Sequence, residues 1–131
     1  MNRPTAIEVI LNAAAAASTG SVVSVADYRN VNLQIGTASS ANLTVKIQGS
    51  FSDNMPTFSS AATVSNHWDY IACYDLNTGL LVAGDTGFVV TGTDDFVNYK
   101  VNTDGLKWLC ATVTACSAGS VTVKADLYDN K

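Results

Sequence analysis

The chain carries one histidine and three cysteines, the residue types that nucleophilic catalysis uses most readily. A Cys–His pair needs contact between the two side chains and a third group that orients the imidazole. His67 precedes Cys73 by six residues, and six residues of extended strand span about 20 Å. The serine-nucleophile pattern Gly-x-Ser-x-Gly does not occur. An ordinary role explains His67, as a loop residue hydrogen-bonded beside Trp68, and we predict that the protein is not an enzyme and has no catalytic residues.

Eleven acidic residues could instead serve as paired carboxylates or as metal ligands. Most of them fall in predicted turns, where an aspartate hydrogen-bonds nearby backbone, so the two positioned carboxylates of a glycosidase are not indicated. Asp94, Asp95 and Asn98 could offer oxygen ligands to calcium, but their spacing is not that of an EF-hand. No Cys-x-x-Cys pair favours zinc. The sequence therefore predicts no metal and no cofactor.

The three cysteines do not form an even disulfide framework. If one strand holds both Cys110 and Cys116, they lie about 20 Å apart and cannot be bridged. Cys73 could pair with either of them, and the sequence alone does not decide this. Because free cysteine is among the most buried residue types, we expect three reduced and mostly buried thiols.

Composition limits the partners that the protein can have. The 131 residues fit one domain, only 14% are charged, and the net charge is −4. A typical soluble domain is about a quarter charged, so the surface is unusually poor in charge. The lysines and arginines are scattered singly, which argues against nucleic-acid binding. The longest apolar run, Ala13–Ala17, is too short for a membrane span, and Met1–Pro4 does not resemble a signal peptide. We expect synthesis and assembly in a cytoplasm.

Alternation of apolar and polar residues predicts strands along most of the chain. The clearest are Arg29–Ile35 and Leu43–Ile47, joined by the small polar connection Gly36–Asn42. The last two, Lys107–Ala115 and Val121–Tyr128, flank a turn at Cys116–Ser120. Further strands are predicted at Ala6–Leu11, Val22–Val25, His67–Asp75, Leu80–Ala83, Phe88–Thr91 and Phe96–Val101. Short strands separated by regular turns indicate an antiparallel all-β fold, a β-sandwich or jelly roll.

One strand departs from simple alternation, and another carries a row of aromatic side chains. Leu106–Ala115 has apolar residues on both faces, so it is either central in a layered core or covered by a partner. On the other, Trp68, Tyr70 and Tyr74 share one predicted face. An exposed aromatic row could stack on sugar rings, but burial in the core is the favoured interpretation because aromatic side chains bury large areas.

The C-terminal strands carry a resemblance to a known class of protein. The stretch Gly105–Thr114 followed by Ala118–Val123 resembles small β-sandwich structural proteins of tailed bacteriophages, in which a Ser/Ala/Gly turn precedes a final Thr/Val-rich strand. Upstream, Tyr28–Ile35 and Asn42–Ser50 resemble their paired early strands, with Asp53-Asn54 in the loop that follows. The resemblance covers most of the chain from Tyr28 onward and rests on strand and turn patterns rather than catalytic signatures.

This resemblance implies a virion structural protein, a capsid decoration or cement protein that binds and stabilises the particle lattice. The alternative is a tail or baseplate accessory module, which could contact host glycans. A third possibility, an accessory to a host-wall hydrolase, lacks a visible active site. The implied partners are the major capsid protein or tail proteins, with a homo-oligomer, preferably a trimer, and no nucleic acid or membrane.

Two segments are predicted to contact these partners. We divide the chain into an N-terminal strand or arm, residues 1–19, and a β-sandwich domain, residues 20–131. The arm could add a strand to a neighbour's sheet, and the irregular loop 51–65 could dock on a virion subunit; an ordinary edge strand and a solvated loop are the alternatives. The apolar residues expected at these contacts are Ile7, Val9, Leu11, Phe51, Met55 and Phe58.

Overall fold

The computed structural model describes residues 5–55, 67–92, 96–103 and 105–128, and the regular structure in these ranges is β-strand throughout. Within the same ranges no helix has the length and apolar content needed to cross a bilayer. The strands are β1 Thr5–Ala14, β2 Ser18–Thr19, β3 Val23–Ser24, β4 Asn30–Ser50, β5 Asp69–Ile71, β6 Cys73–Asp75, β7 Leu81–Val82, β8 Phe88–Gly92, β9 Phe96–Val101 and β10 Trp108–Tyr128.

All ten strands belong to one hydrogen-bonded sheet. The main path runs β1-β10-β4-β9-β6-β7, with β2 and β3 also on β10, and β5 and β8 also on β4. Every pairing is antiparallel. The prediction of an antiparallel all-β fold is therefore confirmed. The sandwich or jelly roll is not confirmed, because hydrogen bonds join all ten strands rather than dividing them between two separate sheets.

Two long strands form the spine of this sheet. β4 and β10 each contain 21 residues and pair along their whole length, from Ser50 with Trp108 to Asn30 with Tyr128. The predicted connection at Gly36–Asn42 and the predicted turn at Cys116–Ser120 are both wrong. Each segment instead lies inside a continuous strand, opposite the other, where the register shifts and the ladder bulges.

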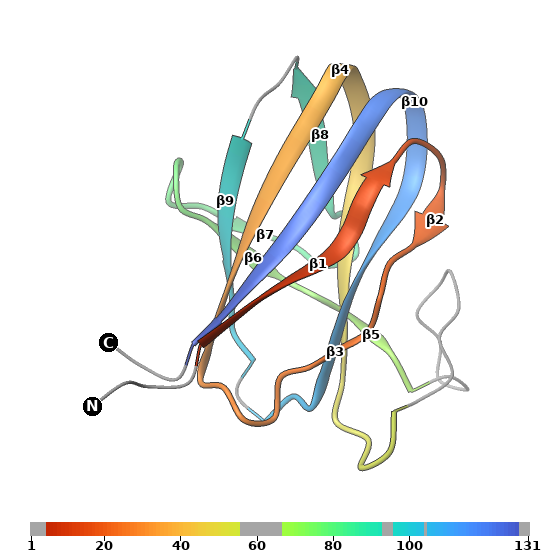
Figure 1. Ribbon diagram of the computed structural model, residues 1–131. Coiled ribbons are helices and arrows are strands. Elements are labelled where there is room, and N and C mark those ends of the chain that lie inside the picture. Colours follow the sequence, from red (N-terminus) through yellow and green to blue (C-terminus); the bar gives the residue numbers. More distant parts are fainter. Residues whose placement is uncertain (1–4, 56–66, 93–95, 104, 129–131) are drawn as a thin grey trace.

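At this point the two long strands bend together (Figure 1). Figure 1 shows them rising side by side, turning over at the top and descending behind. We call residues 30–38 of β4 and 120–128 of β10, with β1, β9, β6 and β7, the front half of the sheet. The back half consists of residues 42–50 of β4 and 108–118 of β10, with β2, β3, β5 and β8. The strong twist that a bulge introduces allows a single sheet to fold back on itself in this way.

One hydrophobic core fills the space that the bend encloses. Its members come from both halves of the sheet and form a single cluster. The alternation predicted in β4 and in the second half of β10 is confirmed, because the predicted apolar side chains are all at most 2% exposed: Val31, Leu33, Ile35, Leu43, Val45, Ile47, Val121, Val123, Ala125 and Leu127. These residues fix which side of each half faces inward.

The first half of β10 is covered on both faces. Leu109, Ala111 and Val113 face the core, while Cys110 and Thr112 lie on the opposite face, and all five are buried. The Gln48 amide donates a hydrogen bond to the Thr112 hydroxyl at 3.0 Å, which pairs two polar groups in this buried place. The chain itself therefore covers this strand, as expected for a central strand of a layered core.

Candidate functional site

The residues that could perform nucleophilic chemistry lie in unlike surroundings. His67 is exposed and has a φ of 60°, whereas Cys73 and Cys110 are buried free thiols. Burial raises the pKa of the Cys73 thiol to about 12 and raises the pKa of the Cys110 thiol well above its usual range. A buried thiol that stays protonated is neither a nucleophile nor a metal ligand.

Thiol reactivity gives a direct test of this burial. At pH 8 we expect Ellman's reagent to modify one thiol quickly in the native chain, that of the half-buried Cys116. All three should react at once in denaturant. Cys73 and Cys110 should react only as fast as the fold opens, because their protonated sulfurs lie in the interior. Two or more fast native thiols would contradict the packing of the core.

The metal candidates do not form a site within the described residues. No group of three or more His, Cys, Asp or Glu side chains in that part of the chain is arranged to hold a metal ion. Of the predicted calcium ligands, Asn98 is exposed on β9, while Asp94 and Asp95 lie outside the described residues.

The aromatic row is not an exposed platform. Trp68 is only 4% exposed, Tyr70 is half-buried beneath the Lys46 ammonium group, which lies 4.7 Å from its ring centroid, and Tyr74 is 46% exposed. Burial of Trp68 confirms the favoured interpretation for that residue. Tyr74 pairs with Lys100 of β9 in the front half, so the three rings do not act together.

The predicted contact residues of the first strand divide between surface and core. Ile7 and Val9 are 71% and 45% exposed, but Leu11 is only 4% exposed and belongs to the core. The expectation that Leu11 would share their face is wrong because β1 carries a bulge. Val9 pairs with Lys124 and Leu11 with the next residue, Val123. The extra residue shifts the alternation, and Leu11 points inward. β1 is an edge strand of its own sheet, one of the two alternatives for this segment.

The predicted contact residues after β4 lie on the surface. Phe51 is 66% exposed and Met55 is 58% exposed, whereas Phe58 lies outside the described residues. The two residues are four positions apart in one loop, and both expose most of their apolar surface. We call residues 51–55 the docking loop.

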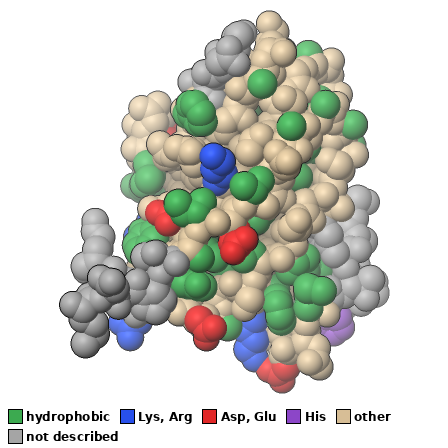
Figure 2. Space-filling model, viewed as in Figure 1, with side chains coloured by type: hydrophobic (Ala, Val, Ile, Leu, Met, Phe, Trp, Pro, Cys, Tyr) green, Lys and Arg blue, Asp and Glu red, His purple; other side chains and the backbone are tan. Residues whose placement is uncertain are grey.

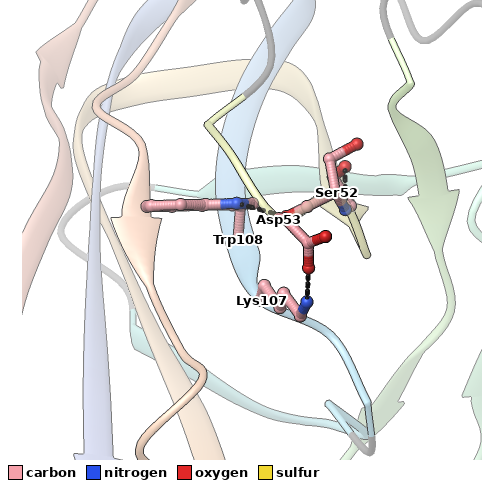
Figure 3. A network of polar contacts seen from close by, with 5 residues as sticks. Ser52, Asp53, Lys107 and Trp108 are labelled. Carbon is pink, nitrogen blue, oxygen red and sulfur yellow. Dashed lines mark hydrogen bonds and ion pairs between the residues drawn. The ribbon is translucent and has the colours of Figure 1, made fainter.

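The docking loop is held by the strand that lies beside it (Figure 3). The Trp108 indole donates a hydrogen bond to the carbonyl oxygen of Ser52 at 2.9 Å, and Lys107 forms an ion pair with Asp53. At the base of the loop, the Lys107 backbone N–H donates to the Ser50 carbonyl at 2.9 Å. The hydrogen bond and positive charge of Lys107 lower the pKa of the Asp53 carboxyl below its usual value.

A glycine from the same stretch as Lys107 and Trp108 lies beside the Phe51 ring. Gly105 has a φ of +81°, and a Cβ atom built on it would lie 3.4 Å from the Phe51 ring. The ring therefore packs against bare backbone while most of its surface faces solvent. Phe51 and Met55 thus stand on a loop in which Trp108 holds the Ser52 carbonyl and Lys107 holds the Asp53 side chain. Sequence reasoning identified the two apolar residues but not Lys107 and Trp108 as their supports.

Comparison with known proteins shows the fold. No protein-family model and no curated protein sequence matches the chain. Two solved structures are similar. The SPBc2 prophage-derived protein YomS is 16% identical, with a TM-score of 0.69 over 98% of this chain and 96% of that protein. The PBSX exported protein XepA is 18% identical, with a TM-score of 0.70 over 98% of this chain but only 39% of that protein. The chain thus shares its fold with whole YomS and with part of XepA.

Proposed function

We propose that this chain is a structural protein of a bacteriophage particle that works by presenting surfaces to other virion proteins rather than by catalysis. The observation that carries the proposal is the docking loop. Phe51 and Met55 are exposed on it, and a hydrogen bond from Trp108 and an ion pair with Lys107 hold it. The fold shared with two proteins named for prophages supports the viral setting. So does the resemblance of the sequence to small phage structural proteins.

The physics of association favours such a loop as an anchor. A partner that covers both side chains gains roughly 25 cal/mol for each Å² of apolar surface removed from water. Ordering a free loop on binding would offset much of this gain. In this chain the Trp108 hydrogen bond and the Lys107 ion pair restrain Ser52 and Asp53 before binding. The few charges on the surface lower the cost of removing water around the contact.

The role that fits these features best is capsid decoration. In this role the docking loop contacts the major capsid protein at a repeated lattice site, and the chain acts as a homo-oligomer, preferably a trimer. Several weak contacts made by one oligomer then together give tight binding, because each further contact is intramolecular once the first has formed. In this proposal the chain is assembled in the host cytoplasm and ends up in the virion.

The docking loop is tested by removing its apolar groups. We expect the double variant Phe51→Ser and Met55→Ser to lose at least tenfold in affinity for phage particles that lack the protein, measured by co-sedimentation. Both side chains are exposed in the free chain, so the thermal unfolding midpoint should change little. The matched control is Leu80→Ser with Val89→Ser, which removes two side chains of similar exposure, 66% and 65%, from other elements.

Two outcomes would contradict the docking loop. Unchanged particle binding by the folded double variant would remove it as the contact. An equal loss in the control variant would show that general apolar exposure, and not this loop, drives attachment.

A tail or baseplate module is the second candidate. The observation that favours it is a second exposed face on the front half of the sheet, where Gln34 and Asn98 lie side by side and are both exposed. Attachment to a lattice through the docking loop would not use this face. Electron microscopy of particles carrying a labelled subunit separates the two candidates. Label over the head lattice supports decoration, and label confined to the tail supports the module.

A further inference from the structure

The outer face of the front half presents ordered rows of polar side chains. Because the inward positions of β4 are Val31, Leu33 and Ile35, the residues between them point away from the core. Strand pairing then fixes their neighbours. One row contains Asp126, Asn32, Lys100 and Tyr74, the next contains Lys124, Gln34 and Asn98, and a third contains Thr122, Gly36 and Phe96.

This face carries charged and apolar side chains as well as polar ones. Its rows contain the exposed Lys100, Lys124 and Asp126, and they continue on β1 into the exposed Ile7 and Val9. Figure 2, drawn from the same side as Figure 1, shows acidic, basic and hydrophobic side chains among the others on this surface. Two hollows lie on it and share Gln34 and Lys124 in their linings; one also contains Phe96, and the other contains Ile7, Asn98 and Asp126. Because they share lining residues, the two hollows are neighbours, and we call the pair the trough.

The trough carries side-chain amides that suit the hydroxyl groups of a sugar. A sugar hydroxyl both donates and accepts hydrogen bonds, and the amides of Asn and Gln offer both a donor and an acceptor.

Aromatic rings stand on this face beside the amides. Phe96 is 66% exposed, and its ring lies over Gly36, where an added Cβ atom would be only 2.8 Å from a ring carbon. Tyr74, in the row of Asn32 and Lys100, is 46% exposed. An exposed ring gives an apolar surface for the C–H face of a pyranose, and neighbouring polar groups fix its orientation.

We propose that this trough binds a neutral, hydroxyl-rich glycan chain, with Gln34 and Asn98 hydrogen-bonding to it and Phe96 supplying the stacking surface. We call it the glycan face. The proposal goes beyond a structural role and uses no residue of the docking loop, so each can fail without the other. A chain that attached to a particle through the loop would keep this face free for a host surface.

The test is a titration of the isotope-labelled full chain, followed by NMR chemical shifts. The probes are two neutral oligosaccharides, an N-acetylglucosamine tetramer and a cellulose-type glucose hexamer, with glycerol-phosphate teichoic acid as the anionic comparison. At least one neutral probe should give saturable shifts at Gln34, Asn98 and Phe96, with a Kd between about 10 μM and 1 mM, equivalent to roughly 4–7 kcal/mol. No saturation with either neutral probe at millimolar concentration, or binding of teichoic acid alone, would overturn the proposal.

Variants localise the binding. The double variant Gln34→Ala and Asn98→Ala should bind at least tenfold more weakly, while the control Asn42→Ala, an exposed amide on the same strand beyond the bend, should bind normally. Gly36→Ala is a finer variant, because its new Cβ must displace the Phe96 ring and leaves every amide in place. It should weaken binding with little change in the unfolding midpoint. Normal affinity in both the double variant and Gly36→Ala would place any sugar binding elsewhere.

Discussion

Replacing Gly119 with alanine is expected to lower the free energy of unfolding by about 4 kcal/mol or more, which is a large fraction of the stability of a domain. Gly119 lies in the bend of β10 with a φ of +72°, and an added Cβ would lie 2.5 Å from the Cα of Ala41 and 2.8 Å from the carbonyl oxygen of Ala38. Both contacts are with the backbone of β4, so no side chain can move aside. The two long strands would have to separate where the sheet turns over.

A second glycine separates the steric effect from the dihedral effect. Gly79 has nearly the same φ, +74°, but an added Cβ there would meet only the hydroxyl of Tyr74, at 3.9 Å. Gly79→Ala should therefore lower the free energy of unfolding by only about 1–2 kcal/mol, which is the cost of an alanine in the left-handed conformation. Urea denaturation followed by circular dichroism measures both variants. Equal losses at the two positions would show that the strands do not approach closely at the bend.

The bend is the part of the fold that sequence reasoning could not find. Alternation predicted the strand faces correctly, because burial on one side of a sheet leaves a period of two in the residues. Small polar residues at Gly36–Asn42 and Cys116–Ser120 suit a turn and a bulge equally well. What decides between them is that the two segments lie opposite each other in the sheet. That pairing joins residues far apart in the chain, and no local pattern reports it.

The same limit applies to the candidate surfaces. Exposure of Phe51 and Met55 could be expected from an irregular, polar stretch that contains them. The support from Trp108 could not, because it depends on the register that sets Trp108 opposite Ser50. Leu11 was misplaced by a single bulge residue. The glycan face was missed because its rows combine four strands, and each strand alone shows only ordinary polar positions.

Truncation of a core leucine in either half of the sheet should destabilise the whole chain by about 2–5 kcal/mol. Leu33 and Leu43 form a matched pair, since both belong to β4, lie on opposite sides of the bend and are 1% and 2% exposed. Each alanine variant removes the same atoms from the same core cluster. If the folded-over sheet is one cooperative unit, all unfolding signals of a given variant should shift together, in Leu33→Ala as in Leu43→Ala.

The positions of the two tryptophans make this test specific. Trp108 begins the back half of β10 and Trp68 immediately precedes β5, so intrinsic fluorescence reports on the back half. Leu33→Ala lies in the front half, yet it should lower the fluorescence midpoint in urea as far as it lowers the midpoint followed by circular dichroism. Leu81→Ala, at a side chain that is 67% exposed, should stay within about 0.5 kcal/mol of the unchanged chain. A fluorescence transition that Leu33→Ala leaves in place would mean that the two halves unfold separately, with two cores instead of one.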